Sequence, residues 1–247
     1  MNNPTTKKTV LVTGGSRGIG AAISLELGNS NFNVVVNYNR NNEEANKIVN
    51  KIISNGGNAI AIQSNIANKN ECEGLFDKII KHFGPVDILI NNAGITRDKS
   101  FRKMQLSEWS EVIDTNLSSV FNTCQLAIPH MIEQKYGRII NISSVIGQTG
   151  GFGQTNYAAA KAGLIGFSKS LALETAKHGV TVNCICPGFI NTEMVAEMPI
   201  QVLDGIKAKI PAAKLGETED IANGVSYLIK ATYMTGQCLN INGGLYM

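Results

Sequence analysis

The sequence predicts an α/β fold of the doubly wound kind, in which helices cover both faces of one parallel β-sheet. Short apolar runs alternate with longer helical stretches along the whole chain. Most of these runs are apolar throughout, which is typical of parallel strands buried on both faces. A glycine-rich turn follows the first run. Together these observations predict seven parallel strands, right-handed crossovers and a single domain spanning residues 1–247.

The first half of the chain contains four of the expected strands. They are predicted at residues 9–13, 33–38, 58–63 and 86–90, with helices at 19–27, 43–54 and 71–83 between them. The helix at 43–54 places Ile48, Val49, Ile52 and Ile53 on one face, as an amphipathic helix packed against a sheet requires.

The second half continues the alternation with a longer helical region at residues 107–134. This region contains Pro129, which lacks an amide hydrogen, so we expect a kink or break there. The later strands are predicted at 138–142, 180–186 and 237–240, and the later helices at 156–178 and 219–229.

An irregular segment follows the sixth strand, at residues 187–211. It contains three prolines and two glycines around two short, apolar, helix-like pieces, 194–198 and 202–206. A segment of this length without regular structure is usually functional in a compact domain. Its position after a strand predicts a substrate lid.

Composition excludes several classes of protein. Hydrophobic residues make up 43% of the chain and charged residues 17%, as in globular proteins, and a net charge of +3 is too small to indicate a nucleic-acid partner. No apolar run approaches the ~18 residues that cross a membrane. Residues 1–8 lead into a strand instead of a signal-peptide core, so we expect a cytoplasmic protein.

The cysteines and histidines suggest neither disulfides nor a metal site. The chain has five cysteines, an odd number, with no CxxC spacing, and Cys184 and Cys186 would share one face of a strand. We expect reduced core thiols. His82, His130 and His178 are scattered, without the spacing of paired metal ligands.

Three side chains suited to proton transfer are expected to meet in one place. Tyr157 and Lys161 stand four positions apart in an alanine-rich stretch that favours helix, so they share a helical face. Ser144 follows the strand at 138–142, and the glycine-rich loop at 147–153 allows strand end and helix start to meet.

The chemistry of these groups points to a carbonyl substrate. A phenol has an ordinary pKa near ~10, and a nearby ammonium that lowers it by ~3 units would contribute about 4 kcal/mol. Lys161 is expected to supply much of this effect. A tyrosine and a lysine four apart are, by themselves, more often packing and a solvated charge. The expected position of Ser144 beside them favours the catalytic interpretation over the structural one.

The glycine-rich turn after the first strand suits a dinucleotide. Its glycines fall at Gly14, Gly18 and Gly20, which is not the strict GxGxxG spacing. The mechanics are the same: a tight turn exposes backbone to a pyrophosphate, and a helix N-terminus faces the negative charge. A purely structural turn is the alternative, but its place at the start of the alternating pattern favours the dinucleotide.

The end of the second strand indicates which dinucleotide. No acid that could accept from an adenosine ribose occurs between Phe32 and Asn42. Asn39 and Arg40 stand there instead, and Arg17 lies in the glycine turn. Because arginine binds phosphate through charged hydrogen bonds, we expect NADP(H). Either arginine could instead be a solvated loop residue.

These motifs together resemble the short-chain dehydrogenase/reductase family, with its Rossmann fold, over essentially the whole chain. The resemblance rests on the glycine turn, Asn92-Ala93-Gly94, Asn116, Ser144, Tyr157 with Lys161, and Pro187-Gly188. Within the family the chain is similar to bacterial 3-oxoacyl reductases, which act on acyl-carrier-protein thioesters or on acetoacetyl-CoA. Residues 91–98, 101–104, 152–157 and 242–247 resemble the acetoacetyl-CoA branch most.

The resemblance implies a role for each catalytic residue. Tyr157 would protonate the 3-keto oxygen while the nicotinamide delivers hydride, Lys161 would hydrogen-bond the nicotinamide ribose, Ser144 would hold the carbonyl, and Asn116 would support a water in the proton relay. A buried structural amide is the alternative for Asn116. The resemblance also implies a homotetramer, and the following cofactor contacts: Gly14, Ser16, Arg17, Gly18, Ile19, Gly20, Asn39, Arg40, Asn65, Ile66, Asn92, Ala93, Gly94, Tyr157, Lys161, Pro187, Gly188, Ile190 and Thr192.

Substrate contacts are expected at the edge of the sheet where its strands end. They are Asp98, Ser144, Phe152, Gln154 and Phe189. A basic cluster near Asp98 could meet an anionic carrier, although such clusters are usually only solvated; it consists of Arg97, Lys99, Arg102 and Lys103.

The carrier of the acyl group is the remaining question. Reductases that dock acyl carrier protein present basic residues at positions that resemble Lys135 and His178, and a histidine is mostly neutral at pH 7. We therefore expect NADPH-dependent reduction of acetoacetyl-CoA to 3-hydroxybutyryl-CoA, with the acyl-carrier-protein reaction as the alternative. A catalytically silent regulator would lack the tyrosine or the lysine. An NAD-dependent sugar or steroid dehydrogenase would carry an acid after the second strand.

Overall fold

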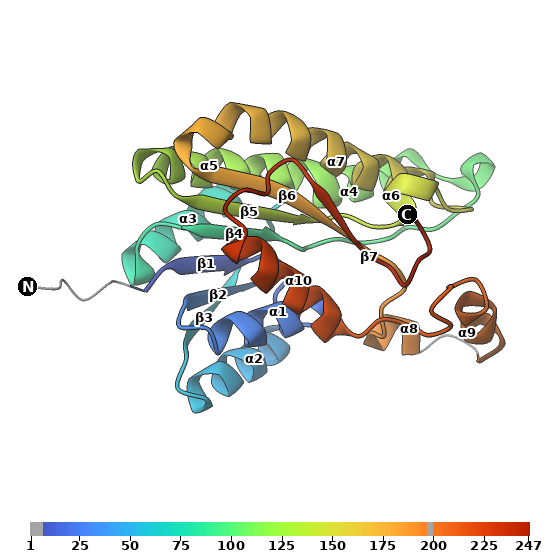
Figure 1. The fold of residues 1–247 in the computed structure, drawn as a ribbon, viewed down its shortest axis with the longest axis horizontal. Helices are drawn as coiled ribbons and strands as arrows, with labels where there is room; N and C mark the ends of the chain where they lie inside the picture. Colours follow the sequence, from blue (N-terminus) through green and yellow to red (C-terminus); the bar gives the residue numbers. More distant parts are fainter. Residues whose placement is uncertain (1–6, 197–199) are drawn as a thin grey trace, which may run out of the picture.

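The computed structural model describes residues 7–196 and 200–247 and confirms the predicted fold class. One sheet of seven parallel strands runs through the molecule in the order β3-β2-β1-β4-β5-β6-β7 (Figure 1). The strands are β1 Thr9–Val12, β2 Asn33–Tyr38, β3 Asn58–Gln63, β4 Ile88–Asn91, β5 Gly137–Ile142, β6 Val180–Pro187 and β7 Cys238–Ile241.

Helices cover both faces of this sheet, as Figure 1 shows. The long helices are α1 Gly18–Gly28, α2 Asn42–Ser54, α3 Lys69–Phe83, α5 Ser119–Glu133, α7 Thr155–Thr175 and α10 Thr218–Lys230. Helices α1, α2 and α10 pack on one face, and α3, α5 and α7 pack on the other. Strand β1 contributes side chains to the hydrophobic cores on both faces of the sheet. Val10 and Val12 pack on the side of α1, α2 and α10, and Leu11 packs on the side of α3, α5 and α7.

The order of the strands fixes where a ligand can bind. The chain moves outward from β1 to β2 and β3, then returns to the other side of β1 for β4 and the later strands. Ligands of such folds bind at this switch point, beyond the carboxyl ends of the strands. The glycine turn from residue 13 to 18 follows β1 and opens α1, so it lies at this point.

We expected a kink or break at Pro129, and the break is wrong, because α5 continues through this residue. Pro129 lies inside α5 on an exposed face, where water can reach the carbonyl oxygen that lacks a helical donor. The helical region is instead interrupted by the π-helical turn Asp114–Ser118, which follows the short helix α4 Leu106–Ile113. A π turn inserts one residue into the helix, often at functional sites, and this one presents Asn116 to the interior.

Two loops contain short helices, of which only the one before α7 was unexpected. Helix α6 Ile146–Thr149 occupies the start of the glycine-rich loop before α7. The expected lid contains α8 Glu193–Ala196 and α9 Ile200–Lys207, which overlap the helix-like pieces predicted at 194–198 and 202–206. Residues 197–199, which belong to that segment, lie outside the described residues. Within the described ranges, no helix has the length and apolar character needed to cross a lipid bilayer.

Candidate active site

The end of β5, helix α6 and the start of α7 converge on one buried site. The hydroxyl of Ser143 donates to the carbonyl oxygen of Lys161 at 2.7 Å, which ties the strand end to the middle of α7. A Cβ on Gly147 would lie 2.7 Å from the carbonyl carbon of Lys161, so only glycine fits where the loop crosses the helix. The loop therefore folds back as the sequence suggested, and it brings Ser144 beside Tyr157.

Lys161 is buried and held by the backbone of the neighbouring strand. Its Nζ donates to the carbonyl oxygen of Ile142 at 2.7 Å and lies 5.6 Å from the centre of the Tyr157 ring. Burial disfavours an ammonium, and it lowers the pKa of Lys161 from 10.5 to about 8. The lysine therefore remains largely protonated at neutral pH.

The pKa of Tyr157 moves in the direction opposite to our expectation. Burial raises the pKa of this phenol, the hydroxyl of Ser144 lowers it by hydrogen bonding, and the carboxylate of Asp98 raises it. The expectation that Lys161 dominates is wrong, because desolvation of the phenolate outweighs any attraction to the ammonium, which is directed at the Ile142 carbonyl. A phenol of raised pKa stays protonated at neutral pH, so it is available as a proton donor.

Asn116 links the π turn to the loop after β4. Its Oδ1 accepts from the backbone N–H of Ile95 at 2.8 Å, and its Nδ2 donates to the Ile95 carbonyl at 2.9 Å. A Cβ on Gly94 would lie 3.4 Å from Asn116 Oδ1 and 3.6 Å from Lys161 Nζ, so amide and ammonium border the same glycine. Asn116 thus adjoins the lysine while its amide is satisfied by backbone.

The glycine turn after β1 has the close packing that a dinucleotide site requires. Gly14 and Gly18 have positive φ angles of 61° and 50°. A Cβ on Gly20 would collide with the carbonyl oxygen of Gly14, so the first turn of α1 lies directly against the glycine turn. Asn92 braces it from β4, because its Nδ2 donates to the Thr13 and Gly14 carbonyl oxygens at 3.0 and 3.1 Å. The amide of Asn92 is therefore occupied by the turn.

Asn37 makes a second brace that the sequence analysis did not select as a site residue. This buried side chain on β2 accepts from the N–H of Gly14 at 3.4 Å and donates to the Ser64 carbonyl at 3.1 Å. It therefore joins the glycine turn to β2 and the end of β3. A polar residue inside an apolar strand is the signal that could have identified it.

The side chains predicted to bind the phosphate of the cofactor lie around this turn. Arg17 precedes α1, Asn39 and Arg40 follow β2, and all three side chains are exposed. Thr192, from the distant lid segment, comes within 3.5 Å of a Cβ placed on Gly18. The helix N-terminus, the exposed turn and the two arginines suit a phosphorylated dinucleotide.

The other predicted cofactor residues lie beyond the same edge of the sheet. Asn65 and Ile66 follow β3, and the Ile66 carbonyl accepts from Asn122 Nδ2 at 3.1 Å. Pro187 ends β6, and its carbonyl accepts from the N–H of Val145 at 2.9 Å. The remaining predicted contacts occupy the same turn or loops: Ser16 and Ile19 beside the glycines, Ala93 after β4, and Gly188 and Ile190 after β6.

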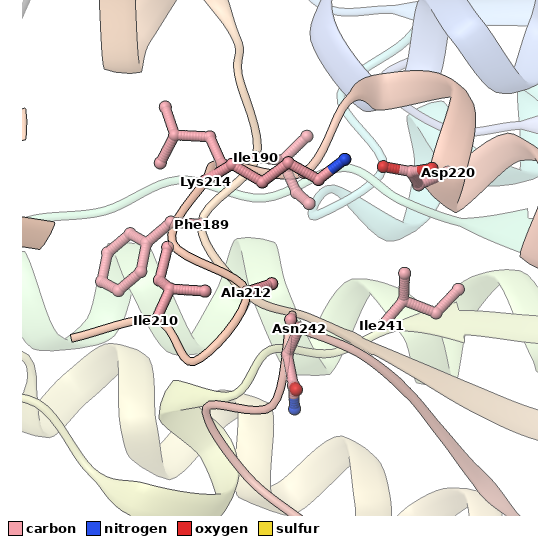
Figure 2. Close-up of a pocket in the computed structure, with 11 residues that line it drawn as sticks. Phe189, Ile190, Ile210, Ala212, Lys214, Asp220, Ile241 and Asn242 are labelled. Carbon is pink, nitrogen blue, oxygen red and sulfur yellow. The ribbon is translucent and has the colours of Figure 1, made fainter. Parts of the chain in front are cut away.

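The predicted substrate residues do not form one cluster. Gln154 donates to Asp98 Oδ2 at 2.8 Å, which ties the loop before α7 to the loop after β4. Phe152 is 97% exposed, so its ring lies in solvent. Phe189 lines a separate, mainly apolar hollow of about 90 Å³ between the lid segment and the C-terminal residues, which also contains Ile210 (Figure 2).

The basic cluster after β4 is partly neutralised. Arg97 makes a two-pronged contact with Glu111, with N–O distances of 2.9 and 2.8 Å, and Lys99 lies 2.7 Å from Glu108. Two of the four cations are thus paired with acids of α4, and the cluster offers less positive charge to a carrier than its sequence suggests.

Lys135 and His178 lie far from the catalytic edge of their own chain. Lys135 precedes β5 and His178 precedes β6, so both lie at the amino ends of these parallel strands. A Cβ on Gly179 would collide with the Lys135 carbonyl oxygen, which shows that the two positions are neighbours. They are separated from Ser144 and Tyr157 by the length of the sheet.

The glycine turn at the switch point and the adjoining serine, tyrosine and lysine define the site of a dinucleotide-binding oxidoreductase. A family model described as short chain dehydrogenase matches residues 8–202, and the chain belongs to this family. Within the family it falls into the 3-oxoacyl reductase group.

Three relatives represent that group, each about the length of this chain. A 3-oxoacyl-(acyl-carrier-protein) reductase of Staphylococcus aureus (strain Mu50) is 46% identical over 242 residues, which cover 97% of this chain and 98% of the relative. The enzymes of the same name from Synechocystis and Buchnera aphidicola are each 46% identical over 245 residues, covering 98% of this chain and 98% and 99% of the relatives.

Proposed function

We propose that this chain reduces the 3-keto group of a 3-oxoacyl thioester with NADPH, and that acyl carrier protein carries the acyl group. The observation that carries the proposal is the meeting of Ser144, Tyr157 and Lys161 beside the glycine turn of a dinucleotide fold. The names of the relatives support 3-oxoacyl-(acyl-carrier-protein) substrates.

Three residues of this chain have different roles at the 3-keto group. NADPH supplies hydride to the carbon when it is bound. Ser144 holds the keto oxygen beside Tyr157, and the phenol of Tyr157 donates the proton that this oxygen gains during reduction. Lys161 positions the strand end and the helix through its bond to the Ile142 carbonyl, and its ammonium favours the phenolate that remains.

The phosphorylated cofactor is proposed from the side chains around the glycine turn. Arg40 follows β2 where an NAD-specific fold would carry an acid, and Arg17 stands at the N-terminus of α1. Both guanidinium groups are exposed and suit a 2′-phosphate, which they can bind through two parallel hydrogen bonds.

Acetoacetyl-CoA, our expectation from the sequence, has weaker support than the carrier-protein thioester. That expectation rested on four segments that resemble the CoA branch, residues 91–98, 101–104, 152–157 and 242–247, and on a missing docking charge at His178. The relatives, which are similar over almost the whole chain, are named for acyl-carrier-protein substrates instead. His178 and Lys135 lie at the opposite edge of the sheet, so they cannot meet a carrier docked at the catalytic site of the same chain. In the homotetramer that we propose for this chain, they would serve a neighbouring subunit, so their distance from the site of their own chain excludes neither carrier. The resemblance of these four segments to the CoA branch keeps acetoacetyl-CoA as the second candidate.

The experiment is an assay of NADPH oxidation by the purified protein with an acetoacetyl thioester, followed by mass spectrometry of the product. We expect one 3-hydroxyacyl product per NADPH consumed. Tyr157→Phe is the control that keeps the fold and removes the proton donor. NADPH consumption without a 3-hydroxyacyl product, or none with either thioester, would contradict the proposal.

A further inference from the structure

Three of the five cysteines lie together at one side of the sheet. Cys184 and Cys186 are on β6, and Cys238 is on the neighbouring edge strand β7 (Figure 1). Cys184 and Cys238 are register partners in the parallel pairing, so their side chains leave the same face. Neighbouring strands lie about 4.8 Å apart, which falls within the Cα separation of about 4.4–6.8 Å that a disulfide accepts. A disulfide also needs the two Cβ atoms within about 4.5 Å, so forming it draws β6 and β7 slightly together at this point.

The two register partners differ in their access to solvent. Cys184 is fully buried, and its Sγ lies 3.1 Å from the hydroxyl of Ser168 on α7. Cys238 is partly exposed because no strand follows β7 in the sheet. In the single chain a small oxidant can therefore reach Cys238 first, with the Cys184 thiol beside it on the neighbouring strand.

The surroundings make Cys238 the reactive thiol of the group. Hydrogen bonds from the Cys184 and Cys186 thiols lower the pKa of Cys238, and the ammonium of Lys169 on α7 acts in the same direction. Because the thiolate is the nucleophilic form, this favours reaction at Cys238. The two remaining cysteines differ: burial raises the pKa of Cys72 to about 11 and that of Cys124 to about 12.

The cysteine group lies directly behind the catalytic residues. Ser168, which contacts Cys184, also accepts a hydrogen bond from Asn141 Nδ2 on β5 at 2.7 Å. The next residue on β5 is Ile142, whose carbonyl oxygen holds Lys161. The thiols of Cys184 and Cys186 both raise the pKa of Lys161, a sign of their proximity to its ammonium. A change at Cys184 therefore takes place in the same buried layer as the proton donor.

We propose that Cys238 and Cys184 form a disulfide when the protein meets hydrogen peroxide. The Cys238 thiolate attacks one peroxide oxygen and the O–O bond breaks, which leaves a sulfenic acid and releases hydroxide. The Cys184 thiol then attacks the sulfenic sulfur, so the S–S bond forms and the hydroxyl leaves as water. Two thiols are oxidised and one peroxide is reduced. The disulfide links β6 to β7 behind Lys161.

The test uses chemical readouts, so it does not depend on the proposed function. The folded protein is treated with hydrogen peroxide, its remaining thiols are counted under denaturing conditions, and its peptides are sequenced by mass spectrometry without reduction. We expect the loss of two thiols per chain, a peptide pair joined through Cys238, and recovery of both thiols with dithiothreitol.

Matched variants identify the partner, because Cys184 and Cys186 occur in one peptide. We expect Cys186→Ser to form the disulfide, and Cys184→Ser and Cys238→Ser to lack it. Cys72→Ser is the control and keeps the disulfide. An unchanged thiol count in the original protein, or a disulfide that persists in Cys184→Ser, would overturn the proposal. Cys238 is partly exposed, so its serine variant gives a folded protein even if a change at Cys184 impairs folding.

Discussion

The catalytic residues and the predicted phosphate-binding cations are built in different ways. Ser144, Lys161 and Asn116 are buried, and each hydrogen-bonds backbone of a neighbouring element. Arg17 and Arg40 lie on the surface beside the glycine turn, and neither is part of an ion pair within the described ranges. The proposed reaction therefore depends on groups that also hold the fold together. Cofactor choice depends on side chains that the fold does not require.

The largest effect on activity is expected from a substitution among the buried catalytic residues. Tyr157→Phe removes the phenolic proton and leaves a ring of nearly the same size in a site that is already buried. Turnover should fall at least ~10²-fold, while the dissociation constant of NADPH stays nearly unchanged. Steady-state kinetics and a fluorescence titration with NADPH measure the two quantities. Normal turnover by the variant would show that another group donates the proton.

The buried ammonium predicts how stability changes with pH. Lys161 has a pKa of about 8 in the folded protein and 10.5 as its ordinary value, a difference of 2.5 units or about 3 kcal/mol. Between these values the unfolded chain binds the proton and the folded chain does not, so the free energy of unfolding rises with pH from this source. Below pH 8 the buried charge is fully present and its cost is complete.

Lys161→Met should remove this rise, which denaturant unfolding between pH 7 and 10.5 can measure. Lys177→Met is the control, because this lysine has an exposed side chain just beyond the end of the same helix. It should keep the pH dependence of the original protein. Parallel curves for the original protein and Lys161→Met would contradict the assigned burial of the charge.

Among the exposed cations, a single substitution should change the preference for NADPH over NADH and little else. Arg40→Ala is expected to weaken NADPH by roughly 10- to 150-fold, because a charged hydrogen bond contributes about 1.5 to 3 kcal/mol. NADH should be affected much less, and thermal stability should stay the same. The measurement is KM for both cofactors, with Arg102→Ala, another exposed arginine, as the control. If NADPH selectivity survives Arg40→Ala, Arg17 or Asn39 carries it.

The smallest effect is expected where a surface cation is already paired. Glu111→Gln breaks the contact with Arg97, whose side chain is 39% exposed. Such pairs contribute about 0 to 1 kcal/mol, so the free energy of unfolding should change by no more than this amount. Chemical denaturation at low and high salt measures it. A larger loss would mean that the pair holds the loop after β4 in place.

The sequence predicted the strands and the meeting of the catalytic groups because both follow from local patterns. Apolar runs define the buried strands, and the spacing of Tyr157 and Lys161 defines a helical face. The interruption at residues 114–118 was not predictable from Pro129, because a proline on an exposed helical face costs less than the pattern implies. Tertiary contacts of Asn116 with the backbone of Ile95 fix the π turn instead.

Properties set by burial were harder to predict. The sequence places Lys161 next to Tyr157, but only the three-dimensional surroundings show that desolvation dominates the pKa of the phenol. The positions of Lys135 and His178 show a similar limit, because their distance from the site follows from strand direction and order. Asn37 was overlooked as a brace because its partners, Gly14 and Ser64, come from other elements.

The most direct test of the central claim compares the two thioesters. The purified protein is given acetoacetyl-acyl-carrier-protein and acetoacetyl-CoA with NADPH at physiological salt, and kcat/KM is measured for each. We predict a value at least ten times higher for the carrier-protein thioester. An equal or higher value for acetoacetyl-CoA would contradict the proposed carrier and establish the CoA thioester as the substrate.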